Sequence, residues 1–140
     1  MQSYIITSYI GVGPLKFGMK RTEIHNLIGA PQRTRKSRFS GESTDFWHDN
    51  GLQLTFSESI EELVEISLYP NLPHVELNGI KLFEEPGMQV ISALRNLDNS
   101  PLEKVGVTIF LKIGLSLTGF LSGDDDQKSV SAFINGRWDS

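Results

Sequence analysis

Cysteine is absent from the 140 residues of this sequence. The chain can therefore form no disulfide, no thiolate zinc site and no cysteine nucleophile. Long hydrophobic runs are also missing, since nothing approaches the roughly 20 apolar residues that a membrane-spanning helix needs. The first ten residues hold a short apolar patch with no preceding Lys or Arg, so they do not predict a signal peptide. These absences predict a cytoplasmic protein with no membrane segment.

Charge is modest in amount and uneven in position. The net charge is -4, yet four bases fall within six residues, at Arg33, Arg35, Lys36 and Arg38. This basic run reads as a loop between a helix and a sheet, and a contact to an acidic partner patch or a phosphate is its alternative role. Acidic clusters elsewhere argue against nucleic acid as a direct partner and favour a basic protein partner.

Two halves of the chain resemble each other. The length and the hydrophobic fraction of 39% suit a single domain, residues 1–140. Residues 13–19 and 79–88 each close on Gly-Met before a helical pattern, and GLQLTF at 51–56 parallels GLSLTGF at 114–120. The spacing predicts two half-repeats, at about 11–70 and 77–137, produced by duplication. Chance similarity between short apolar strands is the alternative.

The sequence pattern of each half-repeat predicts one helix followed by three strands. Apolar residues recur at helical spacing near 20–28 and 88–97, and alternate in the segments that follow. We therefore expect an α+β fold of two layers, a tandem repeat of a helix plus a three-stranded antiparallel meander, forming one sheet with both helices on one face. The other face should be polar with scattered aromatics, including Phe120 and Phe133, as suits a docking surface.

Motifs for catalysis or cofactor binding are not recognisable. The three histidines form no His-x-x-x-His pair for zinc, and His25 reads as a residue of the helix surface. The glycines of 11–18 do not have the spacing of a phosphate-binding loop, and the triplet 124–126 lacks the alternating ligands of a calcium loop. The sequence predicts no enzyme, no metal and no cofactor, with catalysis around His48 as the alternative.

A family resemblance lies in the segment from Gly11 to Pro31, through LKFGM at 15–19 and LIGAP at 27–31. It resembles small bacterial helix-plus-three-strand modules, which include outer-membrane assembly lipoproteins and the tandemly duplicated β-lactamase inhibitor protein. A chain without cysteine on that plan also resembles immunity proteins of bacterial polymorphic-toxin and contact-dependent growth inhibition systems. That resemblance implies a cytoplasmic antitoxin that binds and neutralises a cognate toxin domain, with a basic nuclease as the expected target. A non-enzymatic protein-binding module in envelope or complex assembly is the alternative.

Partner binding should depend on acids beside aromatic anchors, because acids speed the encounter with a basic toxin and buried aromatics supply affinity. Trp47 lies between two aspartates next to the Asn50-Gly51 turn, although a place in the core is its alternative. The expected partner-binding residues are Trp47, Asp45, Asp49, Glu58, Glu61, Glu62, Asp124, Asp125 and Asp126.

Overall fold

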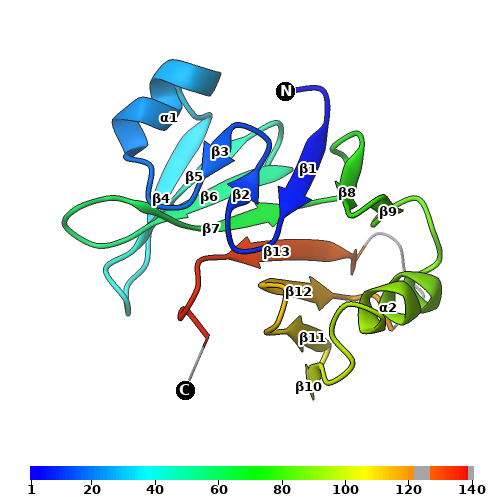
Figure 1. Ribbon diagram of the computed structural model, residues 1–140. Helices are drawn as coiled ribbons and strands as arrows, with labels where there is room; N and C mark the ends of the chain where they lie inside the picture. Colours follow the sequence, from blue (N-terminus) through cyan, green and yellow to red (C-terminus); the bar gives the residue numbers. More distant parts are fainter. Residues whose placement is uncertain (122–126, 139–140) are drawn as a thin grey trace.

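Eight strands form the larger of two sheets in the computed structural model, which describes residues 1–121 and 127–138 (Figure 1). Four strands follow one another in the first half: β4 (Arg33–Lys36), β5 (Ser43–Trp47), β6 (Leu52–Phe56) and β7 (Leu63–Leu68). Four follow in the second: β10 (Leu102–Lys104), β11 (Val107–Phe110), β12 (Leu115–Thr118) and β13 (Ser129–Phe133). Their order is β10-β11-β12-β13-β7-β6-β5-β4, with every neighbouring pair antiparallel. The last strands of the two meanders therefore pair with each other at the centre.

Short strands form the smaller sheet, which the sequence did not predict. They are β1 (Tyr4–Thr7), β2 (Gly11–Val12), β3 (Leu15–Lys16), β8 (Val75–Leu77) and β9 (Ile80–Lys81). Their order is β3-β2-β1-β8-β9, and β1 and β8 pair in parallel, joining the start of each half. Segments of two to four residues are too short to show the period-two pattern that identifies longer strands.

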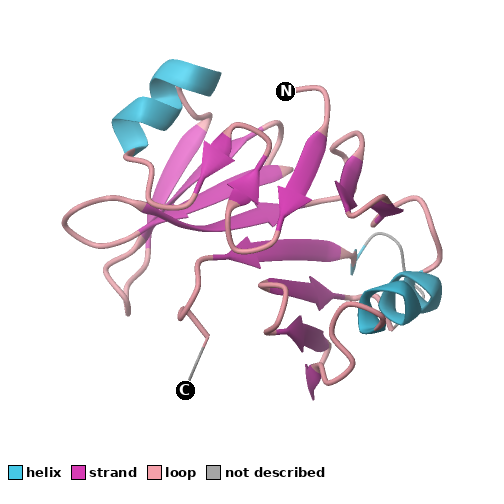
Figure 2. Cartoon of the chain, viewed as in Figure 1, coloured by secondary structure: helices cyan, strands magenta, loops and turns pink. Residues whose placement is uncertain are grey.

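The two helices are α1 (Arg21–Ile28) and α2 (Gly87–Arg95), and they lie at different ends of the molecule (Figure 2). Helix α1 begins where the Glu23 carboxylate accepts the Lys20 N–H at 3.0 Å and ends at Gly29, whose φ is +91°. Neither helix of the described residues is long and apolar enough to cross a bilayer. Helices this short are marginal alone in water, so packing on the sheets must stabilise them.

One core joins both helices, the smaller sheet and one face of the larger sheet. Ile24 of α1 and the α2 residues Val90, Ile91 and Leu94 are buried in it. The larger sheet contributes a cross-strand row, since its register aligns Leu54, Ile66, Ala132 and Leu115. We call this side of the larger sheet its inner face.

The structure corrects three further details of the predicted fold. Each helix is followed by four strands of the larger sheet instead of three, because β4 and β10 also pair at its edges. Residues 33–36 are strand β4 and not a loop. Phe120 is buried in the core, although the sequence predicted it on the open side of the sheet. Strand β4 is exposed along its whole length, so its sequence lacks the apolar alternation that predicts a half-buried strand.

Arg137 anchors the segment that follows β13. Its Nη1 and Nη2 donate to the Glu42 carboxylate at 2.7 and 2.9 Å, and its Nε donates to Glu65 at 2.7 Å. The hydrogen bonds from Arg137 hold the pKa of Glu42 below its ordinary value of 4.5. The same hydrogen bonds, with those to Glu65, raise the pKa of Arg137. Both carboxylates extend from strands or turns of the first half, so this cluster ties the two halves together.

Substituting Glu42→Gln should lower the free energy of unfolding at pH 7 by about 1 kcal/mol, because it removes the charge that Arg137 pairs with. The pKa of Glu42 is lower in the folded protein than in the unfolded chain, so ionised Glu42 stabilises the fold above pH 4.5. That contribution is lost as the pH falls through the folded pKa. Urea unfolding of wild type and variant should therefore show the full difference at pH 7 and little difference near pH 2.

The matched control for this prediction is Glu103→Gln, which removes a carboxylate from an exposed pair with Arg95. It should change the stability little at either pH. A difference between wild type and Glu42→Gln that is equal at both pH values would contradict the role given to Arg137.

Candidate partner-binding surface

The buried carboxylate of Asp45 organises the contact between α1 and the sheet. Asp45 is fully buried on the inner face, where its Oδ2 accepts from Arg21 Nε at 3.2 Å and contacts His25 Nε2 at 2.7 Å. Its Oδ1 accepts the Thr34 hydroxyl at 2.6 Å. The Arg21 guanidinium also lies over the Phe56 ring, 4.5 Å from its centroid. Sequence reasoning missed Arg21 and Thr34 and placed His25 on the helix surface.

This cluster does not have the geometry of a catalytic triad. In a triad the hydroxyl bonds to the imidazole, which takes up its proton. Here the Thr34 hydroxyl bonds to the carboxylate instead, on the oxygen that does not contact His25. Asp45 therefore serves as a shared acceptor that fixes α1 and β4 on β5. Within the described part of the chain, no group of three or more acidic or histidine side chains is placed to hold a metal ion.

Trp47 is also a core residue, with only 4% of its surface exposed. Its Nε1 donates to the Gly29 carbonyl at 3.2 Å, and the His25 ring meets it edge-on at 5.9 Å between centroids. A side chain held this way cannot insert into a partner without opening the α1 contact. Of the two expected alternatives, the structure therefore places Trp47 in the core, beside buried Asp45.

The acids of the β6–β7 connection are exposed or half-buried, but two of them already have partners. Glu61 pairs with Arg21, and Glu62 pairs with Lys20 at 3.2 Å. The main chains of Arg21 and Glu61 are also hydrogen-bonded, because Arg21 N donates to the Glu61 carbonyl at 3.1 Å. Carboxylates near a helix amino terminus also interact favourably with the helix dipole. These two acids consequently stabilise α1, and Glu58 is the exposed acid of this connection that has no ion-pair partner in the described residues.

The structure does not bring the expected acids together. Asp49 is exposed in the β5–β6 turn, whereas Glu58, Glu61 and Glu62 lie in the connection at the other end of β6. A strand of five residues separates the two groups by roughly 17 Å. The remaining expected acids, Asp124, Asp125 and Asp126, lie outside the described residues.

The outer side of the larger sheet carries short polar side chains. Cross-strand register places Gln53 opposite Ser67, Ser67 opposite Ser131, and Ser131 opposite Ser116. The Ser67 and Ser131 hydroxyls are 2.9 Å apart, as are those of Thr44 and Thr55. All are half-buried, while both helices and the smaller sheet pack on the inner face. We define the open face by Thr44, Gln53, Thr55, Ser67, Ser116 and Ser131.

Two aromatic residues of the outer side are covered by their own neighbours. Phe46 is 2% exposed, with the guanidinium groups of Arg33 and Arg35 over its ring at 3.8 and 5.6 Å. Phe133 is 1% exposed and meets Tyr9 and Trp138 edge-on. Phe133, which the sequence predicted on this face, and Phe46, which it did not, are therefore both closed over by other side chains. What the open face presents is mainly hydroxyl and amide groups.

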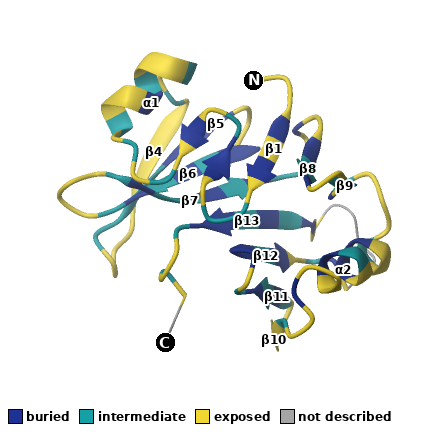
Figure 3. Cartoon of the chain, in the orientation of Figure 1, coloured by how far each residue is buried: buried dark blue, intermediate teal, exposed yellow. Residues whose placement is uncertain are grey.

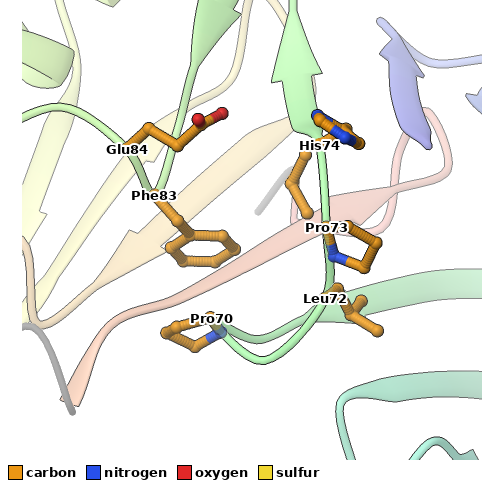
Figure 4. Close-up of a pocket in the computed structure, with 7 residues that line it drawn as sticks. Pro70, Leu72, Pro73, His74, Phe83 and Glu84 are labelled. Atoms are coloured by element: carbon orange, nitrogen blue, oxygen red, sulfur yellow. The ribbon is translucent and has the colours of Figure 1, made fainter. Parts of the chain in front are cut away.

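A small hollow lies where the chain passes from the first half to the second (Figure 4). Its volume is about 250 Å³, and Phe83 lies across it from Leu72 and Pro73. His74 and Glu84 also line it. Sites for drug-sized ligands have roughly 300–1,000 Å³, so this hollow can accept no more than a side chain or a very small molecule.

The arrangement defines a class: a mostly β protein with two helices, two open sheets and one polar face of the larger sheet left uncovered by the described elements. By sequence the chain belongs to the family described as domain of unknown function DUF7738, whose profile matches residues 9–93. The match runs from the β1–β2 turn into α2. No curated protein and no solved structure matches the chain.

Proposed function

We propose that this protein is a cytoplasmic immunity protein that binds a cognate bacterial toxin domain through the open face. The observation that carries the proposal is the position of the packing elements. Both helices and the smaller sheet cover one side of the eight-stranded sheet, which leaves the polar side available to a partner except at the end where Arg137 and Trp138 lie over Glu65 and Phe133. A sheet covered on one side and polar on the other is a rigid platform, since its strands are fixed by the core beneath them.

The size of the open face suits a protein partner. Eight strands spaced about 4.8 Å apart span roughly 34 Å, and strands of three to six residues are roughly 10–20 Å long. The flat area is then on the order of 500 Å², and the turns at both ends enlarge it toward the roughly 800 Å² that each partner contributes to a standard interface. Short Ser and Thr side chains let a partner approach the sheet closely.

Charge favours a basic toxin domain, such as a nuclease, as the partner. The chain has a net charge of -4, and Asp49 and Glu58 are exposed in turns at opposite ends of β6. Exposed acids at the rim of an interface accelerate association with a basic partner. Glu61 and Glu62 contribute to the same field while they hold α1. Asp45 and Trp47 support the surface from beneath without touching the partner.

Duplication of a half-domain is our proposal for the origin of this platform. Each half runs through a helix and then four consecutive antiparallel strands, and β7 and β13 close each half and pair with each other. Each half also contains a buried aspartate near its helix. Asp45 fixes α1, and Asp98, just after α2, accepts the main-chain N–H groups of Ser100 and Lys112, each at 3.0 Å. A common ancestor for the two halves would account for both features.

Co-expression tests the proposed function. Where the gene immediately upstream encodes a large secreted protein, the toxin to use is the carboxy-terminal domain of that protein, produced in a bacterial host with and without this chain. We expect growth arrest by the toxin domain alone, normal growth with the chain present, and co-elution of the two purified proteins. A toxin domain that stays active with an excess of the folded chain, and forms no complex with it, would contradict the proposal and favour a role in protein-complex assembly.

A further inference from the structure

Strand β4 is an open edge of the larger sheet. It pairs only with β5, and all four of its residues are exposed (Figure 3). Ser37 N donates to the Glu42 carbonyl at 2.8 Å where the hairpin closes. Main-chain bonds between antiparallel strands recur at every second residue, so Thr34 and Lys36 direct their N–H and C=O groups away from β5. These groups form a template to which an extended segment can add as a further strand.

The side chains of this hairpin are strongly basic. Arg33 and Arg35 lie on the outer side, held over the Phe46 ring. In the described part of the chain, no carboxylate forms an ion pair with Arg35, Lys36 or Arg38. A hollow of about 450 Å³ lies beside these bases, with Phe39 and Thr44 in its lining. Phe39 is 97% exposed, so it offers an apolar contact next to the positive charge.

We propose that β4 binds an acidic, extended segment of a protein partner, which adds to the edge of the sheet as a strand. Main-chain hydrogen bonds from residues 34 and 36 would provide affinity, and carboxylates facing Arg33 and Arg35 would provide specificity. A second copy of β4 is a poor occupant, because its sequence RTRK repeats the same charges. The inference does not depend on the proposed function, since β4 lies at the edge of the sheet, beside the open face.

Charge placement favours a short acidic segment over nucleic acid. Four residues of β4 extend over roughly 13 Å, and carboxylates lie near both ends of this strip. At one end Asp49 lies beside the residue that precedes β4, since its main-chain N–H donates to Gln32 Oε1 at 2.8 Å. At the other, Glu58 shares a hollow of about 350 Å³ with Lys36 and Gly41. A long polyanion following the strip would meet these acids, whereas a segment of a few residues would not.

The test uses a fluorescein-labelled peptide of alternating Glu and Val, measured by fluorescence anisotropy at low salt. We expect it to bind wild type, and to bind the double variant Arg33→Glu, Arg35→Glu at least about tenfold more weakly. Lys81→Glu with Lys104→Glu is the matched control, because it makes the same charge change on the edge strands β9 and β10. This control should retain wild-type affinity. Equal binding by both double variants, or no binding by wild type, would overturn the proposal.

Two further probes separate strand addition from simple charge attraction. A peptide with alternate amides N-methylated keeps its charge but cannot pair with β4, so it should bind at least about tenfold more weakly. Hydrogen exchange should show new protection at the amides of residues 34 and 36 when the unmodified peptide is present. Equal binding of the methylated peptide, or tighter binding of oligothymidylate than of the acidic peptide, would overturn the proposal. Arg33→Gln with Arg35→Gln serves as a milder variant if the charge reversal prevents folding.

Discussion

Replacing Asp45 with alanine is expected to lower the free energy of unfolding by about 3 kcal/mol or more. The variant would leave Arg21, His25 and Thr34 without the carboxylate that all three contact. Arg21 is only 16% exposed; it would keep its pair with Glu61, but a largely buried charge that loses one of its carboxylate partners is costly. The loss should be concentrated at α1, because these contacts fix that helix on β5. Urea unfolding at pH 7 measures the change in stability.

Asp45→Asn separates the charge of this residue from its shape, since asparagine keeps the volume and one carbonyl acceptor. We expect Asp45→Asn to lower the free energy of unfolding by less than Asp45→Ala does. Glu84→Ala is the matched control for removing an exposed acid, and it should change the free energy of unfolding by no more than about 0.5 kcal/mol. An Asp45→Ala protein as stable as this control would show that the cluster around Asp45 does not hold α1 in place.

Replacing Ser131 with arginine should weaken binding of the toxin domain at least about 100-fold, or about 2.7 kcal/mol. Ser131 lies at the β7–β13 seam in the middle of the open face, with its hydroxyl 2.9 Å from that of Ser67. A long charged side chain at the centre of a complementary interface both blocks close approach and introduces a charge that the partner does not match. Because the new side chain points to solvent, the fold itself should tolerate the change.

Calorimetry or surface-based binding measurements compare this variant with Gln89→Arg, which adds the same charge at an exposed position of α2. That helix packs on the inner face, so the control should bind as wild type does. Circular dichroism establishes first that both variants are folded. Equal affinities for the two would place the interface away from the open face and make the turns that carry Asp49 and Glu58 the next candidates.

Strand β5 illustrates why the candidate site was only partly predictable. Its residues 44–47, TDFW, show no alternation of apolar and polar side chains. The sequence therefore does not tell which side of the strand faces the core. The tertiary structure places Asp45 and Trp47 inward against α1 and Phe46 outward under two arginines. A signal for the inward aspartate does exist in α1, where Arg21, Ile24 and His25 share one helical face. That spacing places a base and a histidine beside the buried Ile24.

The basic hairpin shows the reverse case, in which the residues were recognised but their secondary structure was not. Arg33, Arg35, Lys36 and Arg38 stand out in the sequence by charge alone. An edge strand exposed on both sides has no buried face, so no hydrophobic alternation identifies it. Its strand conformation comes from pairing with β5, which is a contact between segments and not a property of the segment.

The sequence by itself determined the elements with a strong local pattern: the helices near 20–28 and 88–97, and the amphipathic strands of both halves. Their periodic apolar residues can be buried in only one way. Tertiary structure decided what depends on pairing between distant segments. It joined β1 to β8 and β7 to β13, and it tied Glu61 and Glu62 to α1 while leaving Asp49 at the other end of β6. Strand register and ion pairing are set by which segments meet, and residues far apart in the chain carry no local record of that meeting.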